Sequence, residues 1–148
     1  MNTKEEFFIF EKEKQKVFDK FYQEKKWPYK RIFGKDNKKY DVVILVNKKW
    51  FKVEEKFRSK EWSDLAVETI QDTETNSSGW IYYTEAEYIF YGMGERIYAI
   101  NVEKLRILIE KHESLFEIKF SKKGWGNTKN IIIPFYLILD NKIGKIIK

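Results

Sequence analysis

Two carboxylates and an amine have the types and spacing that metal-assisted phosphodiester cleavage requires. Glu54 and Lys56 lie two residues apart at the end of an apolar segment, and Asp41 begins the apolar segment before it. Two carboxylates can hold Mg²⁺, which takes oxygen ligands and keeps several of its waters. The ion polarises a phosphate and generates a nucleophilic water, while a nearby lysine offsets charge that develops on the phosphoryl oxygens. We therefore expect these residues to form a site for phosphodiester hydrolysis.

A β-hairpin over residues 40–57 is expected to bring these side chains together. Residues 41–46 are predicted to form one strand, residues 47–49 the turn and residues 50–57 the return strand. Side chains alternate along a strand, so Glu54 shares a face with Lys56, and Glu55 is left on the apolar face. The alternative interpretation is a solvated edge strand with a surface ion pair, which contributes ~1 kcal/mol or less.

At these residues the chain resembles the PD-(D/E)XK nuclease superfamily, whose signature is an Asp followed on the next strand by Glu or Asp, any residue, and Lys. The match is Asp41 with Glu54-Glu55-Lys56; Tyr40 stands where the motif name has Pro, and the middle residue is charged. The resemblance implies that Asp41, Glu54 and the Glu55 backbone carbonyl are metal ligands, with Lys56 beside the attacking water. It also implies an endodeoxyribonuclease that uses Mg²⁺ or Mn²⁺ and leaves 5′-phosphate and 3′-hydroxyl ends.

The order of predicted elements is similar to the αβββαβ core of that superfamily. A capping box at residues 3–6 predicts a helix from about Lys4 to the mid-twenties, which Pro28 stops. A short strand over residues 29–33 precedes the hairpin, Ser63 is predicted to cap a second helix to about Asp72, and further strands follow near residues 80–83 and 88–91. The expected fold is therefore α/β and restriction-endonuclease-like, with a mixed central sheet flanked by helices.

A single domain over residues 1–148 is expected, with the core at about residues 3–91. Residues 92–148 are predicted to be a C-terminal decoration with a strand near residues 97–100 and a helix capped by Asn101. Its last strands are expected near residues 115–120 and 131–139.

Polar residues on the two predicted core helices are further candidates for the site. Family members often carry an acid on the first helix that faces the metal; Glu13 fits best, since Val17 and Phe21 follow it at i+4 and i+8, and Glu11 is nearly as good. On the predicted second helix, Glu68 and Gln71 share a face, and the resemblance implies a polar residue there that positions water or the lysine, so Gln71 joins the expected catalytic set. A plain solvated helix surface is an equal alternative for these residues.

The charge of the chain suits a polyanionic partner. Its formal net charge is +6 and its isoelectric point about 9.2. Candidate DNA phosphate contacts flank the proposed site and are Lys35, Lys38, Lys39, Arg58 and Lys60. Solubility is the alternative role of these cations, and the abundance of Lys, Ile and Asn is also a mark of an AT-rich genome.

The residue types that are missing exclude other chemistries. The chain has no Cys and one His, His112, so thiolate zinc sites, cysteine nucleophiles and histidine-rich metal sites are excluded. The longest apolar run, residues 131–139, is shorter than the ~20 residues of a membrane span, and no signal-peptide pattern begins the chain. We expect a soluble, intracellular, cytoplasmic protein without a membrane partner.

These observations together predict a small metal-dependent nuclease that acts on duplex or branched DNA. Small members of the superfamily it resembles include Holliday-junction resolvases and restriction or phage nucleases, which often work as dimers, so a homodimer is expected. One alternative is a non-catalytic module of the same fold that binds nucleic acid or another partner. Another is an α/β interaction protein in which the Glu-x-Lys match is accidental.

Overall fold

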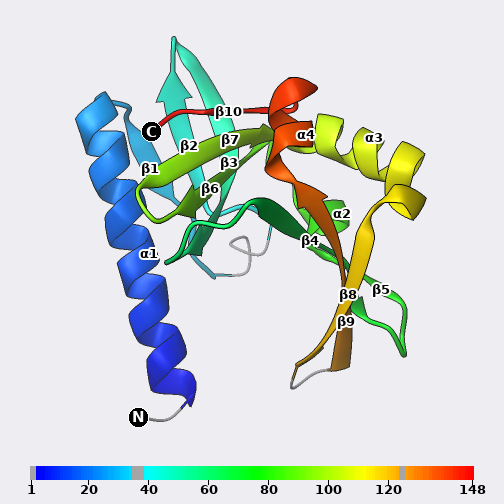
Figure 1. The fold of residues 1–148 in the computed structure, drawn as a ribbon. Coiled ribbons are helices and arrows are strands. Elements are labelled where there is room, and N and C mark those ends of the chain that lie inside the picture. The colour runs from blue at the N-terminus through cyan, green and yellow to red at the C-terminus, as the bar shows by residue number, and fades with distance from the viewer. Residues whose placement is uncertain (1–2, 35–38, 124–125) are drawn as a thin grey trace.

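Two β-sheets organise the chain in the computed structural model, which describes residues 3–34, 39–123 and 126–148 (Figure 1). The larger, sheet A, has six strands in the spatial order β1 (Tyr29–Arg31), β2 (Val42–Val46), β3 (Lys49–Arg58), β6 (Tyr88–Met93), β7 (Arg96–Asn101) and β10 (Gly144–Ile146). The smaller, sheet B, has four in the order β5 (Ser77–Ser78), β4 (Asp64–Asp72), β9 (Gly126–Pro134) and β8 (Glu117–Lys123).

The helices lie beside and between these sheets. They are α1 (Thr3–Lys25), α2 (Trp80–Tyr83), α3 (Val102–His112), the 3₁₀ turn η2 (Glu113–Leu115) and α4 (Phe135–Asp140). Strand β3 is parallel to β6, whereas the other pairings in sheet A are antiparallel. The expected α/β class with a mixed central sheet and helices is therefore confirmed. None of the helices in the described part of the chain is long and apolar enough to cross a membrane.

The hairpin that carries the motif forms nearly as predicted. Val42 pairs with Val53, and Val46 pairs with Lys49, so the turn consists of Asn47 and Lys48 alone and β3 begins at Lys49. Both turn residues have positive φ, 50° and 68°, which is typical of the two-residue turns that match the twist of a hairpin. Beyond Val42, Asp41 N donates to Val53 O and the Asp41 carboxylate accepts from Glu55 N, so Asp41 lies beside residues 53–55 of β3.

Helix α1 packs its C-terminal half on sheet A. Phe18, Phe21 and Tyr22, at i, i+3 and i+4, are buried against apolar side chains of β2, β3, β6 and β7. The N-terminal half extends past the sheet, and Ile9 and Phe10 are exposed there (Figure 1). The helix ends three residues before Pro28, as expected.

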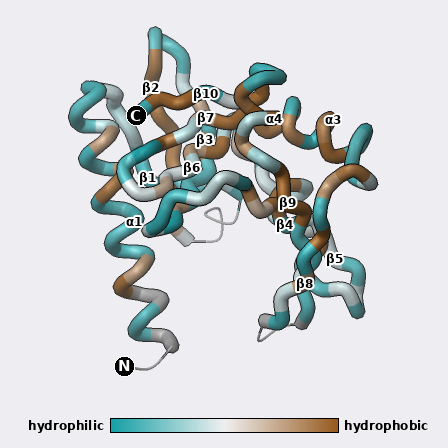
Figure 2. The backbone as a smooth tube through the Cα atoms, in the orientation of Figure 1, coloured by the Kyte–Doolittle hydropathy of each residue, from teal (hydrophilic) through white to brown (hydrophobic). Residues whose placement is uncertain are grey.

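A second core lies where sheet B meets sheet A, α2, α3 and α4. Its fully buried members include Leu65 and Val67 of β4, Ile131 and Ile133 of β9 and Ile89 of β6. Figure 2 shows hydrophobic stretches in β7, β9 and α4 around this junction, and hydrophilic residues toward the end of the β8–β9 hairpin.

The helix predicted over residues 63–72 is wrong, because this segment is strand β4. Leu65, Val67 and Thr69 alternate with Ala66 and Glu68, and this period of two suits a strand that pairs with β9. Pairing of this segment with β9, together with burial of Leu65 and Val67 in the second core, outweighs the local capping signal of Ser63.

Two of the predicted strands are also wrong in whole or in part. Residues 80–83 form the short helix α2, in which Tyr82 N and Tyr83 N donate to Gly79 O at 3.0 and 3.4 Å. A Cβ at Gly79 would lie 2.2 Å from Glu68 O, so only glycine permits this close approach of α2 to β4. The apolar run 131–139 is divided at Pro134, where β9 ends and α4 begins.

The strands β6 and β7 and the helix capped by Asn101, whose side chain accepts from Lys104 N, are confirmed.

Candidate active site

Asp41 is held in place by backbone and side-chain hydrogen bonds at the start of β2. Asp41 N donates to Val53 O at 3.0 Å, and Asp41 O accepts from Ile32 N at 3.0 Å. The Asp41 carboxylate also accepts from Glu55 N at 2.7 Å through Oδ2. These bonds fix the carboxylate at the end of the hairpin, next to Glu54 on the neighbouring strand.

Glu54 is a largely buried carboxyl, with 14% of its side chain exposed, and its Oε1 lies 3.6 Å from Lys56 Nζ. Burial and the negative charge of Asp41 raise its pKa to about 7, although Lys56 and Lys14 act in the opposite direction. The second oxygen, Oε2, is buried and has no hydrogen-bond partner among the described residues. Glu54 Oε2 is thus a buried acceptor in excess.

Glu11, Lys14 and Gln15 of α1 line a small cavity with Asp41 and Glu55, and the cation that α1 contributes there is Lys14. Its side chain is only 12% exposed and forms an ion pair with Glu11 at 3.1 Å. Burial acts to lower the pKa of the Lys14 ammonium, but the charges of Asp41, Glu11 and Glu55 outweigh it and raise the pKa. Glu13, by contrast, is exposed. It lies two residues after Glu11, and two residues turn a helix by about 200°, so the two side chains point in nearly opposite directions.

Glu55 lies on the opposite face of β3 and is enclosed by α1 and β1. The residue is 1% exposed, and its carboxylate accepts from Arg31 Nη1 at 2.7 Å and from Tyr22 OH at 2.6 Å. Arg31 also donates to Asp19 Oδ1 of α1, at 3.0 and 2.7 Å. Burial acts to lower the pKa of Arg31, but hydrogen bonds and charges of Glu55 and Asp19 outweigh it and raise the pKa. A charged residue on the apolar face of β3 is therefore accounted for by a buried ion pair.

Helix α2 provides the other side of the site. Lys56 Nζ lies 4.9 Å from the centroid of the Trp80 ring, a distance at which an ammonium is attracted to the ring face. Tyr83 is exposed, and burial of part of its side chain together with the charges of Glu54, Glu68 and Asp41 raises the pKa of its phenol. Trp80 and Tyr83 therefore join Lys14 as site residues that were not predicted from the sequence.

Hydrogen bonds from α3 and to residue 39 connect α2 to the hairpin. Arg106 of α3 donates to Ile81 O at 2.6 Å and to Thr84 O at 2.7 Å. Thr84 Oγ1 and Glu85 N donate to Lys39 O at 2.9 and 2.8 Å. These contacts fix α2 against the segment that leads into Asp41.

The remaining predicted residues are placed differently from the expectation. Glu68 is buried on β4 and is an electrostatic neighbour of Tyr83. Gln71 is partly buried on the same strand, so the helical face that the two were expected to share does not exist. The sequence signal for β4 was its β-branched residues Val67, Thr69 and Ile70, which favour strands.

Of the five predicted phosphate contacts, Lys35 and Lys38 lie outside the described residues. Lys39 forms an exposed ion pair with Glu85 at 3.4 Å, and Lys60 is exposed. The Arg58 guanidinium lies 5.4 Å from the centroid of the Trp62 ring and 6.0 Å from that of Tyr91.

The donor set suits a hard cation that is held mainly by its waters and a substrate. Within the described ranges, three or more acidic, His or Cys side chains do not gather in a group that could hold a metal ion. Asp41 and Glu54 provide two carboxylates, and Glu54 Oε2 is a buried acceptor without a partner. Mg²⁺ is commonly bound through one or two carboxylates with waters and phosphate completing its shell, so these residues fit the ion.

Comparison with protein-family models, curated proteins and solved structures finds no match to this chain. The class of the protein therefore follows from the fold alone, which is mixed α/β with a mixed central sheet.

Proposed function

We propose that the protein is a metal-dependent nuclease of restriction-endonuclease-like fold that hydrolyses DNA phosphodiester bonds. The observation that supports this most strongly is Glu54. Its carboxylate interacts electrostatically with Asp41, has a buried oxygen without a hydrogen-bond partner among the described residues, and is 3.6 Å from Lys56 Nζ. A buried carboxylate oxygen without a partner is unfavourable, and a metal ion bound at Glu54 Oε2 would satisfy it.

In this proposal Asp41, Glu54 and the Glu55 carbonyl hold Mg²⁺ or Mn²⁺. The bound ion supplies Lewis-acid stabilisation of the phosphate and lowers the pKa of water. The Glu55 N–H orients the Asp41 carboxylate at 2.7 Å, and Lys56, on the face of β3 that carries Glu54, donates to a phosphoryl oxygen. Attack of water on phosphorus breaks the bond to the 3′ oxygen, which leaves with the electron pair and takes a proton. The products carry 5′-phosphate and 3′-hydroxyl ends.

The arrangement of α1 and the first strands supports the proposed fold. Helix α1 covers sheet A, the motif hairpin is β2–β3, and β3 pairs in parallel with the later strand β6. The connection from β3 to β6 differs from the expected single helix, because it contains β4, β5 and the short α2. Sheet B is therefore an addition to the proposed core.

Cleavage of labelled single-stranded, duplex and four-way-junction DNA tests the proposal, with Mn²⁺ or EDTA and matched variants. Glu54→Gln keeps the shape of the side chain but loses the charge, and Lys56→Ala removes the amine. We expect each to lower the cleavage rate at least 100-fold, in keeping with loss of a positioned catalytic group. Glu95→Gln and Lys48→Ala change exposed residues elsewhere and should retain wild-type rates. Metal-dependent cleavage that survives both site variants would refute the assignment.

A second function is favoured by Lys14, which is largely buried and electrostatically coupled to Asp41 and Glu55. Its ammonium can neutralise the carboxylates in place of a metal, as would suit a non-catalytic module that binds nucleic acid or a protein partner. Thermal unfolding with and without Mn²⁺ separates the two functions. A nuclease site should gain stability from the ion, by about 2.7 kcal/mol at 100 times the dissociation constant, and Glu54→Gln should lose that gain. A binding module should gain nothing.

A further inference from the structure

A groove of about 320 Å³ adjoins the candidate site, between the end of β3 and the face of sheet B. Its polar and aromatic lining comprises Arg58, Trp62, Asp64, Lys119, Ser121 and Asn130. Glu54, Lys56 and Arg58 alternate along β3 and so project from one face. The groove therefore continues the line of side chains that carries the proposed catalytic residues.

An arginine and a tryptophan form the β3 side of this groove. The Arg58 guanidinium lies over the Trp62 ring at 5.4 Å and also 6.0 Å from the Tyr91 ring. Trp62 is nevertheless 54% exposed, so much of its indole remains open to a ligand. Aromatic rings held in this way are platforms on which bases of single-stranded nucleic acid stack.

The opposite side is formed by β8 and β9. Lys119 of β8 pairs with Asn130 of β9. The Lys119 side chain is exposed, and its Nζ lies 4.0 Å from the Glu117 carboxylate. The Lys119 ammonium can bind a phosphate, whereas the side chains of Ser121 and Asn130 can both donate and accept hydrogen bonds. Asp64 is the acid of the groove, and its carboxylate is an acceptor for the exocyclic amine of a base.

We propose that this groove binds an unpaired nucleotide of a single-stranded segment next to the bond to be cut. The base stacks on Trp62, while Arg58 and Lys119 contact the flanking phosphates. A single strand fits better than a duplex, because stacking on Trp62 needs a base whose face is free. The volume is also at the lower end of ligand pockets, which matches one nucleotide. This inference rests on the proposed nuclease function and assigns the part of sheet B that lines the groove to substrate selection.

Binding of a fluorescein-labelled thymidine oligonucleotide to the full chain in EDTA tests the groove by fluorescence anisotropy. Trp62→Ala should weaken binding on the order of 5- to 150-fold, the range for loss of one stacked base, and Trp62→Phe should retain most of the affinity. Lys119→Ala should weaken binding and lower the slope of log K against log salt by about 1.

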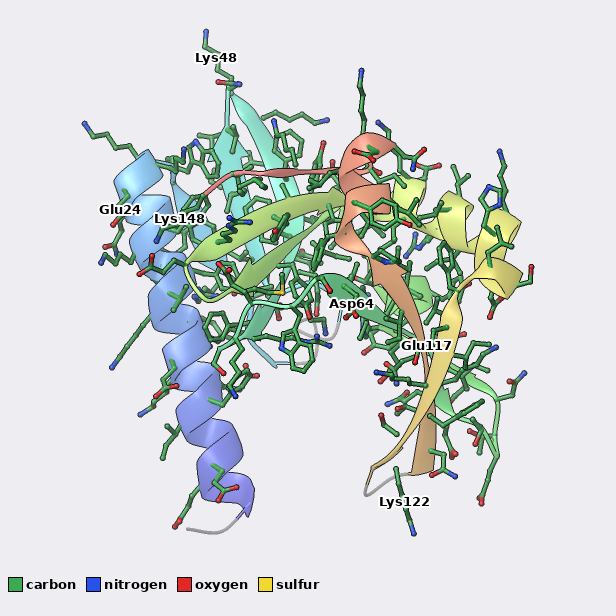
Figure 3. All side chains as sticks on the ribbon, in the orientation of Figure 1. Glu24, Lys48, Asp64, Glu117, Lys122 and Lys148 are labelled. Carbon is green, nitrogen blue, oxygen red and sulfur yellow. The ribbon has the colours of Figure 1, made fainter. Side chains whose placement is uncertain are left out.

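Trp50→Ala is the matched control, because Trp50 is 51% exposed and lies on β3, the strand that carries Arg58. It lies eight residues from Arg58, about 26 Å along β3, and near Lys48, which Figure 3 places at the end of the molecule opposite to Lys122. Circular dichroism and thermal unfolding establish that each variant is folded.

Three outcomes of the binding experiment would overturn the inference. These are equal losses for Trp62→Ala and Trp50→Ala, no loss for a folded Trp62→Ala, and an equal loss for duplex and single-stranded DNA. Refutation of the proposed groove can be distinguished from refutation of the nuclease function, because binding is measured without metal. If Trp62→Ala binds like wild type while Glu54→Gln abolishes cutting, only the groove is refuted. If Trp62 controls single-strand binding but no metal supports cutting, the groove stands and the catalytic function falls.

Discussion

Glu54 should make the protein less stable at neutral than at mildly acidic pH in the absence of metal. Its pKa is about 7 in the folded chain against an ordinary 4.5, so the folded state binds more protons than the unfolded state between these values. Stability therefore falls as pH rises from about 4.5 to 7, by about 3 kcal/mol, and then levels off. Urea unfolding in EDTA at pH 5 and pH 8 measures this change. Glu54→Gln should lack this part of the pH dependence; an identical change in both proteins would contradict the assignment.

The predicted site residues that lie close together in the structure are those whose position follows from strand pairing. Asp41, Glu54 and Lys56 come together because β2 and β3 are adjacent in sequence and joined by a tight turn. Glu13 was preferred from its spacing to Val17 and Phe21, but the buried face of α1 is set by Phe18, Phe21 and Tyr22. Lys14 precedes Phe18 by four residues and so lies on that face, a signal that the sequence contains.

The ion pair of Glu55 joins three elements and should contribute strongly to stability. Glu55 belongs to β3, Arg31 to β1 and Tyr22 to α1, and Arg31 and Tyr22 donate to the Glu55 carboxylate at 2.7 and 2.6 Å. Removal of one partner from a buried pair leaves an uncompensated charge and costs about 3–5 kcal/mol. Arg31→Ala, which leaves the buried Glu55 carboxylate without its guanidinium partner, should lose this amount in urea unfolding. Glu85→Ala, which breaks an exposed pair with Lys39, should lose less than about 1 kcal/mol, and similar losses for both would show that the buried pair contributes little.

At the scale of elements, local signals identified the helices and strands that neighbours in sequence stabilise. The Asn101 cap marked α3, and the apolar segments 88–91 and 97–100 marked β6 and β7. Strand β4 was misjudged because its partner β9 lies about 60 residues further along the chain, where Glu68 meets Asn130 and Val67 meets Ile131. A capping residue stabilises a helix by about 1 kcal/mol, which a buried strand pairing exceeds.

For the molecule as a whole, the two sheets depend on residues from both halves of the chain. Residues 92–148 were expected to decorate a core formed by residues 3–91. In the structure they supply β7 and β10 of sheet A and β8 and β9 of sheet B. Ile131 and Ile133 of β9 are fully buried with Leu65 and Val67 of β4. Without residues 92–148, β4 would lose its pairing with β9, and the loss of β7 would leave β6 as an open edge of sheet A.

A fragment that ends at residue 91 should therefore fail to fold, although it contains the complete motif Asp41, Glu54 and Lys56. The loss of β7 and β9 exposes buried side chains worth about 1.5–3 kcal/mol each, and the sum exceeds the 5–15 kcal/mol that stabilises a typical domain. Circular dichroism and thermal unfolding of the fragment and the full chain check this expectation. The full-length variant Ile131→Ala provides the graded control and should lose about 2–5 kcal/mol while it remains folded. A fragment with a cooperative thermal transition would mean that residues 3–91 form an independent core and that residues 92–148 are added to it.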